Sequence, residues 1–258
     1  MLLTMRVRSI AGFPRSRPRQ IMSTIETNLQ AVRARIVAAA KAAGRDPGDI
    51  SLLAVSKTFT AADVRAAHAA GQRAFGENYV QEALEKIGTL PELPLIWHFI
   101  GAIQSNKTRP IAEHFGWVHS IARMKIAEHL AQTRPRTLGP LDICLQVNVS
   151  GEKSKSGVAP DEVRPLAEAV RTLPQLRLRG LMAVPEPSDD IELQRRRFRG
   201  LRILLERLNA AGFGLDTLSM GMSQDLEAAV MEGATIVRVG TAIFGPRQTR
   251  EEVAGEDA

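Results

Sequence analysis

The chain has 258 residues, 44% of them hydrophobic, and a formal net charge of +6 at pH 7. Five arginines precede the first acidic residue, Glu26, so the rest of the chain carries only about +1, and a broad basic surface for nucleic acid is excluded. The single cysteine, Cys144, excludes an intrachain disulfide framework, and no apolar run reaches the ~18 residues of a membrane span.

The two ends of the chain differ in composition from its centre. Residues 1–22 are rich in arginine, as in mitochondrial targeting segments, but Pro14 and Pro18 would interrupt an amphipathic helix. The interpretation we favour is a disordered extension, or a start codon placed too early with Met22 as the true beginning. Residues 248–258 form an acidic tail, and residues 23–247 are expected to form one domain.

Regular elements begin after the leader. Residues 24–43 have the apolar spacing of a helix, which Gly44 ends. Short β-branched runs then alternate with amphipathic stretches. The expected strands are residues 51–56, 73–76, 95–100, 116–121, 142–150, 178–184, 215–220 and 235–244. The expected helices between them are residues 61–70, 78–88, 107–114, 123–133, 160–172, 190–211 and 223–232.

Eight alternating strands in about 250 residues predict a single (β/α)8 TIM barrel with an extra N-terminal helix, in the α/β class. A doubly wound open sheet is the alternative. That fold favours a glycine-rich turn after the first strand, whereas AVSKTFTAAD stands there. In a barrel, functional side chains lie where the strands end and the loops begin.

Lys57 directly follows the apolar run LLAVS, so its amine would face the barrel mouth. It could be an ordinary surface lysine whose stem covers apolar neighbours. Alternatively, partial desolvation could leave enough neutral amine to condense with an aldehyde as a Schiff base.

Small residues follow the seventh and eighth strands, where barrels often bind phosphate. Ser223 would be the N-cap of the next helix, and Gly240 with Thr241 forms a second such turn. Arg238 lies in an apolar strand and shares a face with Gly240, so it requires a partner inside the barrel. A ligand between Lys57 and Arg238 is therefore geometrically reasonable.

Seven segments in order resemble the pyridoxal phosphate homeostasis proteins, also known as proline synthetase co-transcribed homologues. They are AVSKT (54–58), FGENYVQE (75–82), WHFIG with QSNK (97–107), SKSG (154–157), RGLM (179–182), LSMGMSQDLEAAV (218–230) and VRVGTAIFG (237–245). The resemblance implies a barrel of the alanine-racemase N-terminal type that holds pyridoxal 5′-phosphate (PLP).

The family's site residues can be placed on matching positions. The resemblance implies a Schiff base on Lys57, phosphate contacts from Ser223, Gly240 and Thr241, an arginine (Arg238) at the pyridine nitrogen, and Asn78 beside the ring. Gln224 departs from the acid that the family more often has after GMS.

The implied function is to carry or buffer PLP, and so to maintain vitamin B6 and amino-acid homeostasis, with no catalytic residue and no enzyme activity. A cation at the ring nitrogen weakens the ring as an electron sink. Two-base racemases of this fold also use a tyrosine from a second domain, and the only tyrosine here is Tyr79. A weak PLP-dependent racemase remains an alternative. A barrel aldolase that uses Lys57 on a phosphorylated sugar is a third class.

The remaining expectations concern metals and partners. The five histidines lack metal-ligand spacing, although His98 is kept as a candidate because it lies near a strand end. We expect PLP and apo PLP-dependent enzymes as partners, no nucleic acid and no membrane. We also expect a monomer in the cytoplasm, where a lone cysteine stays reduced.

Overall fold

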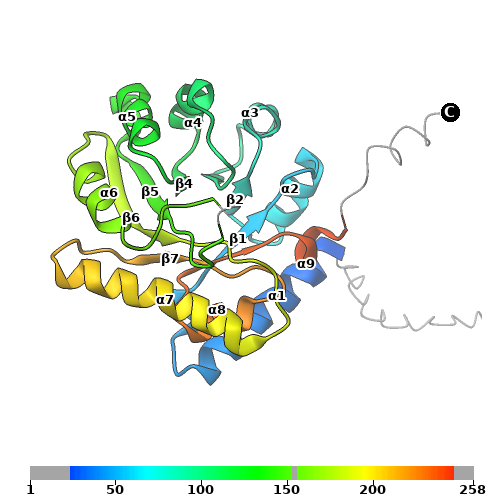
Figure 1. The fold of residues 1–258 in the computed structure, drawn as a ribbon. Coiled ribbons are helices and arrows are strands. Elements are labelled where there is room, and N and C mark those ends of the chain that lie inside the picture. Colours follow the sequence, from blue (N-terminus) through cyan, green and yellow to red (C-terminus); the bar gives the residue numbers. More distant parts are fainter. Residues whose placement is uncertain (1–23, 153–155, 247–258) are drawn as a thin grey trace, which may run out of the picture.

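Eight parallel strands close into a barrel in chain order (Figure 1). β1 pairs with β8, which closes the ring and excludes the open doubly wound sheet. The strands are β1 Ser51–Val55, β2 Ala74–Glu77, β3 Ile96–Phe99, β4 Trp117–Ile121, β5 Leu141–Gln146, β6 Leu176–Met182, β7 Thr217–Ser219 and β8 Ile236–Val239. The computed structural model describes residues 24–152 and 156–246, so the predicted leader 1–22 and tail 248–258 lie outside the described residues.

Helices surround the ring of strands, and the predicted extra helix α1 lies beside α8 and α9 (Figure 1). The helices are α1 Thr24–Ala42, α2 Ala61–Ala69, α3 Val80–Thr89, α4 Thr108–His114, α5 Met124–Thr133, α6 Val163–Val170, α7 Ile191–Ala210, α8 Leu226–Met231 and α9 Thr241–Phe244. The (β/α)8 prediction is therefore confirmed.

Two of the predicted strands extend four or more residues beyond the observed carboxyl ends. The expected strand 235–244 ends at Val239, and its last four residues form α9 with Ile243 buried. A short apolar run suits a buried helix as well as a strand, so periodicity cannot separate them. The expected strand 142–150 ends at Gln146, and only an isolated bridge between Val147 and Val158 follows it.

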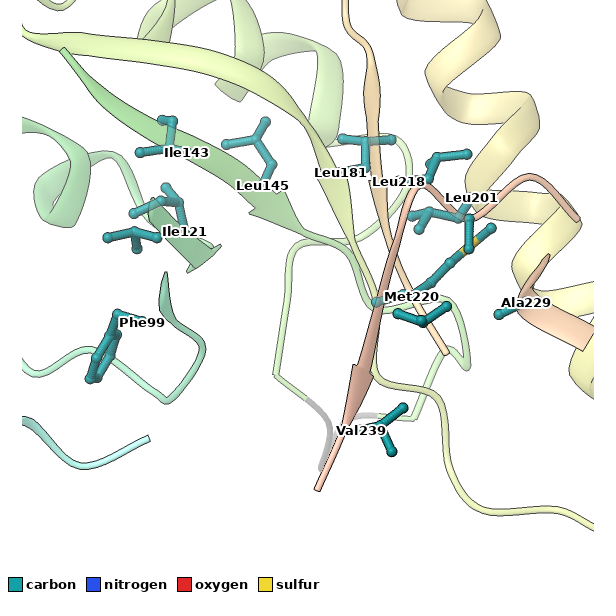
Figure 2. Close-up of a cluster of buried hydrophobic side chains, with 14 of the residues drawn as sticks. Phe99, Ile121, Ile143, Leu145, Leu181, Leu201, Leu218, Met220, Ala229 and Val239 are labelled. Atoms are coloured by element: carbon teal, nitrogen blue, oxygen red, sulfur yellow. The ribbon is translucent and has the colours of Figure 1, made fainter. Parts of the chain in front are cut away.

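The main apolar core lies between the barrel and its helices. Successive side chains of a strand point to opposite faces, and most outward positions of this sheet are apolar. Figure 2 shows Leu181 of β6 and Leu218 of β7 near Leu201 of α7, and all three are buried in one cluster. Burial of this outer layer from water is the main stabilising term for the fold.

The inner face of the barrel is more polar. Arg238 of β8 pairs in register with Leu53 of β1, which places both side chains on one face of the sheet. The buried polar residues of the described chain include His98, His119, Ser219 and Arg238. Buried polar groups require hydrogen-bond partners, so these residues must satisfy one another.

Gly180 allows β6 to approach β7 closely. A Cβ at this position would lie 1.8 Å from the carbonyl oxygen of Thr217, which belongs to the neighbouring strand. We expect Gly180→Ala to lower the free energy of unfolding by roughly 3 kcal/mol or more, because backbone must move to admit the methyl group. Urea unfolding would measure this loss. Gly200→Ala on α7 is the matched control, because nothing lies within 4 Å of its Cβ.

Candidate functional site

A cavity of about 590 Å³ opens at the carboxyl ends of β1, β2, β7 and β8. The six residues that the sequence singles out all line it: Lys57, Asn78, Ser223, Arg238, Gly240 and Thr241. They come from four separate segments of the chain, after β1, after β2, after β7 and at the end of β8, and the closure of the barrel brings them together. Their individual roles toward a ligand remain predictions.

Lys57 stands in the turn that follows β1. Leu53, Val55 and Lys57 alternate with outward residues, so the lysine continues the inward face of the strand. Its side chain is partly buried. The next residue, Thr58, has a φ of 69°, a left-handed conformation that is uncommon for a residue other than glycine. The chain therefore turns sharply just after the lysine.

Asn78 lines the cavity from the segment after β2. Its Oδ1 atom is buried and has no hydrogen-bond partner within the described chain. An unpaired buried polar atom carries a free-energy cost of about 1–3 kcal/mol. Asn78 therefore offers the cavity a polar group that a polar ligand would satisfy.

Arg238 is 3% exposed and projects into the barrel. Its Nη1 donates to Ser219 Oγ at 2.8 Å, and its Nη2 donates to the Ala183 carbonyl at 2.8 Å. Burial lowers the pKa of Arg238 to about 10, and the nearby charge of Asp225 opposes that shift. The guanidinium thus stays protonated at neutral pH, fixed at the floor of the cavity by two neutral acceptors.

Two histidines continue the hydrogen-bond chain from Arg238. His119 Nδ1 lies 2.7 Å from Ser219 Oγ, and His98 Nδ1 lies 2.9 Å from His119 Nε2. Burial lowers the pKa of His98 to about 3, and burial, His98 and Arg238 also lower that of His119. Both rings are therefore neutral at neutral pH. His98 belongs to this chain inside the barrel and does not contribute to the cavity lining.

The loop after β7 differs from its predicted form. Ser223 is not the N-cap of the following helix: α8 begins at Leu226 with Asp225 as the capping position. The Asp225 carboxylate instead accepts a hydrogen bond from the backbone nitrogen of Met222. Gly221 precedes this turn with a φ of +92°. The left-handed turn at the glycine delays the helix, which leaves Ser223 in the cavity wall.

Helix α1 braces the two elements that follow β7 and β8. Arg35 of α1 donates to the Ser223 carbonyl at 2.9 Å and forms a two-pronged ion pair with Glu227 of α8, at 2.8 and 2.9 Å. Asn28 donates to the Ile243 carbonyl of α9 at 2.9 Å. The extra helix thus holds both of the small-residue turns in place.

Sequence reasoning missed part of the cavity wall. The loop between β6 and α7 contributes Val184, Pro187 and Ser188, and Gln194 of α7 lies beside them. No motif of chemical groups marks this loop, and only the closure of the ring brings it opposite Lys57. Tyr79 is 57% exposed and is not a lining residue.

Neither a metal centre nor a membrane span is present in the described part of the chain. No group of three or more His, Cys, Asp or Glu side chains there could hold a metal ion. None of the described helices is long and apolar enough to cross a bilayer.

Comparison with known proteins decides the family. A model of the alanine racemase N-terminal domain matches residues 27–248. The chain is 66% identical over 226 residues to the pyridoxal phosphate homeostasis protein of Pseudomonas aeruginosa, covering 88% of this chain and 97% of the relative. The chain belongs to the pyridoxal phosphate homeostasis protein family. The resemblance drawn from the seven motifs is therefore confirmed.

Other members of the family, and a more distant barrel protein, are also similar to this chain. The Escherichia coli pyridoxal phosphate homeostasis protein is 51% identical over 229 residues, covering 88% of this chain and 98% of the relative. PipY of Synechococcus elongatus, solved with PLP bound, is 37% identical with a TM-score of 0.75, covering 86% of this chain and 100% of PipY. Alanine racemase of Corynebacterium glutamicum, at 16% identity and a TM-score of 0.67, covers 86% of this chain and 61% of the racemase. The last likeness concerns the fold alone.

Proposed function

We propose that this protein binds PLP in the cavity at the barrel mouth and carries or buffers the cofactor, with Lys57 as the covalent attachment point. The observation that carries the proposal is the meeting of Lys57, Arg238 and the turns after β7 and β8 in one cavity. The PLP-bound structure of PipY, 37% identical to this chain, supports the same choice of ligand.

The residues present fit the cofactor. The lining supplies one amine (Lys57), one guanidinium (Arg238) and the hydroxyls of Ser223 and Thr241. These groups complement an aldehyde, a ring nitrogen and a phosphate, respectively. The unsatisfied Oδ1 of Asn78 supports a polar occupant. When bound, PLP supplies an aldehyde carbon open to attack and a ring that withdraws electrons.

Lys57 and Arg238 would have different tasks. Lys57 would supply the amine that condenses with the aldehyde of the bound cofactor. Arg238, held by Ser219 and the Ala183 carbonyl, presents a permanent cation to the ring nitrogen. A cation at that position disfavours protonation of the nitrogen and weakens electron withdrawal. Such a site would retain the cofactor without strongly activating an amino acid.

The cavity lining also favours a carrier over a racemase. Among its described lining residues there is no tyrosine, histidine or cysteine that could act as a second base opposite Lys57. Its one carboxylate, Asp225, accepts from the Met222 nitrogen. Weak racemase activity is the second candidate, because the fold is that of the alanine racemase N-terminal domain.

Partners and location belong to the same proposal. An open-mouthed site suits transfer of PLP to apo PLP-dependent enzymes, and we propose that the protein acts as a monomer in the cytoplasm. The lone Cys144 is buried, and burial raises the pKa of its thiol. A protonated, buried thiol suits a reducing compartment but does not require one.

The absorption spectrum of the purified protein with added PLP tests the proposed function. We expect a visible band that borohydride removes, with the reduced cofactor attached to the peptide that contains Lys57. Amino acids incubated with the loaded protein in D2O should keep their α-hydrogens on the time scale of ordinary enzyme turnover. Exchange at enzyme rates would favour the racemase, and the absence of any reducible adduct would refute PLP attachment.

Arg35 provides a test of whether the turn after β7, which carries Ser223, contributes to PLP binding. We expect Arg35→Met to weaken PLP binding roughly tenfold, because Ser223 and Glu227 lose their common hydrogen-bond donor. Equilibrium titration followed by absorbance would measure the Kd. Arg65→Met is the matched control, since its exposed ion pair joins α2 to Glu92 in the loop between α3 and β3, away from the cavity lining. Equal effects in the two variants would contradict the bracing role.

A further inference from the structure

A buried charged cluster lies behind the turn that carries Lys57. Lys86 of α3 donates from Nζ to Glu77 Oε1 at 2.8 Å, to Glu82 Oε1 at 2.6 Å and to the Ser56 carbonyl at 2.5 Å. Lys86 is 5% exposed and Glu77 is 0% exposed. Fully buried lysines and glutamates are rare unless they pair, so the position of this group requires an explanation.

The strand pattern places the cluster on the opposite side of the barrel wall from the cavity. Glu77 pairs in register with Phe99, whose ring packs against Phe115 in the outer layer. Asn78, the next residue, lines the cavity instead. Neither Glu77 nor Lys86 is a lining residue, so the cluster would not contact a ligand there.

The cluster holds the chain on both sides of Lys57. Before the lysine, Ser56 Oγ donates to Glu77 Oε1 at 2.7 Å, and the Ser56 carbonyl accepts from Lys86. After the lysine, the backbone nitrogen of Thr58 donates to Glu82 Oε1 at 2.5 Å. Thr58 is the residue with the left-handed φ of 69°. Tertiary contacts must maintain such a backbone, and these contacts do so.

Stability alone does not account for the cluster. Because both charges lose their hydration, a buried ion pair contributes no more to the free energy of unfolding than well-packed apolar side chains of similar size. Burial raises the pKa of Glu77, although Lys86 and Ser56 oppose that shift. In addition, Glu77 Oε2 is buried without a hydrogen-bond partner in the described chain. The arrangement is energetically expensive, yet each of its three side chains also forms a hydrogen bond to the Ser56–Thr58 turn.

We propose that Glu77, Lys86 and Glu82 are positioning residues that fix the Ser56–Thr58 turn, and thereby aim the Lys57 amine at the aldehyde carbon of the cofactor. This inference rests on the proposed function of Lys57. The cluster acts through the backbone and does not touch the cofactor. Its loss therefore changes the rate at which the lysine forms and breaks its bond to PLP.

The test compares single variants of the full chain. Lys86→Met removes the shared donor while keeping an unbranched apolar side chain, and Glu77→Gln keeps a carbonyl oxygen for Ser56 and Lys86 but removes the charge. The control is Glu232→Gln, a carboxylate 3% exposed that Arg195 and Arg199 hold between α7 and α8. Stopped-flow absorbance would give the rates of adduct formation and release across pH. A small aldehyde that lacks a phosphate would report the reactivity of Lys57 independently of the proposed phosphate contacts from the turns after β7 and β8.

We expect Lys86→Met to slow adduct formation at least tenfold with both probes, Glu77→Gln to retain most of the rate, and Glu232→Gln to match wild type. A folded Lys86→Met variant with wild-type rates would overturn the proposal, as would an equal slowing in Glu232→Gln. If Lys86→Met does not fold, Glu82→Met, which removes the acceptor of the Thr58 nitrogen at a partly exposed side chain, must still slow the reaction. A wild-type protein with no adduct on Lys57 would instead refute the proposed function itself.

Discussion

Lys57→Ala should abolish the borohydride-reducible adduct with PLP while the barrel remains folded. The substitution removes the amine that adds to the aldehyde, and no backbone bond of the strand ladder depends on that side chain, which lies two residues beyond the end of β1. Noncovalent contacts from Ser223, Thr241 and Arg238 would remain. We therefore expect residual, weaker binding with the spectrum of the free aldehyde, measured by absorbance titration and by mass after reduction.

A matched lysine separates a specific bond from general amine reactivity. Lys125 lies on α5, away from the cavity lining, so Lys125→Ala should keep the full visible band. Circular dichroism of both variants should match the wild-type protein. A yellow, reducible adduct that persists in Lys57→Ala would show that another lysine holds the cofactor.

Acid should destabilise the barrel steeply because two histidines are buried in neutral form. The pKa of His98 is lowered from 6.5 to about 3, and that of His119 is also lowered. Between pH 6.5 and about 3 the unfolded chain therefore binds protons that the folded chain does not, so stability falls as the pH falls. Each histidine contributes about 1.4 kcal/mol per pH unit within its window. Urea unfolding at pH 7 and pH 5 would measure this loss, about 2 kcal/mol of it from His98, with His119 adding in the same direction.

Variants can assign this acid sensitivity to the histidine chain. His119→Asn keeps a polar side chain near Ser219 and should reduce the difference in stability between the two pH values. His114→Asn, at an exposed position on α4, should leave the difference unchanged. A pH difference that stays the same in His119→Asn would place the titrating group elsewhere.

Much of the fold was predictable because each helix and strand carries its own periodicity. The alternation of β-branched runs with amphipathic segments predicts the order of the eight units, and parallel closure places the strand ends at one mouth. Lys57, Ser223, Arg238, Gly240 and Thr241 could be chosen as cavity residues for that reason, whereas Asn78 was implied by the family resemblance. The boundaries that failed, at Val239 and Ser223, depend on local turns at Gly240 and Gly221. A short apolar run or a single serine does not reveal such turns.

The sequence by itself therefore determined the barrel, its order and the residues at its mouth, because these follow from local patterns and from where parallel strands end. Only the tertiary structure decided which groups form hydrogen bonds to the residues at the barrel mouth and to the turns that carry them. Ser219 of β7 accepts a hydrogen bond from Arg238 and bonds in turn to His119 of β4, and Lys86 reaches Ser56 from α3, thirty positions along the chain. Hydrogen bonds between distant segments leave no periodic trace in a sequence. They exist only after the ring has closed and excluded water from its wall.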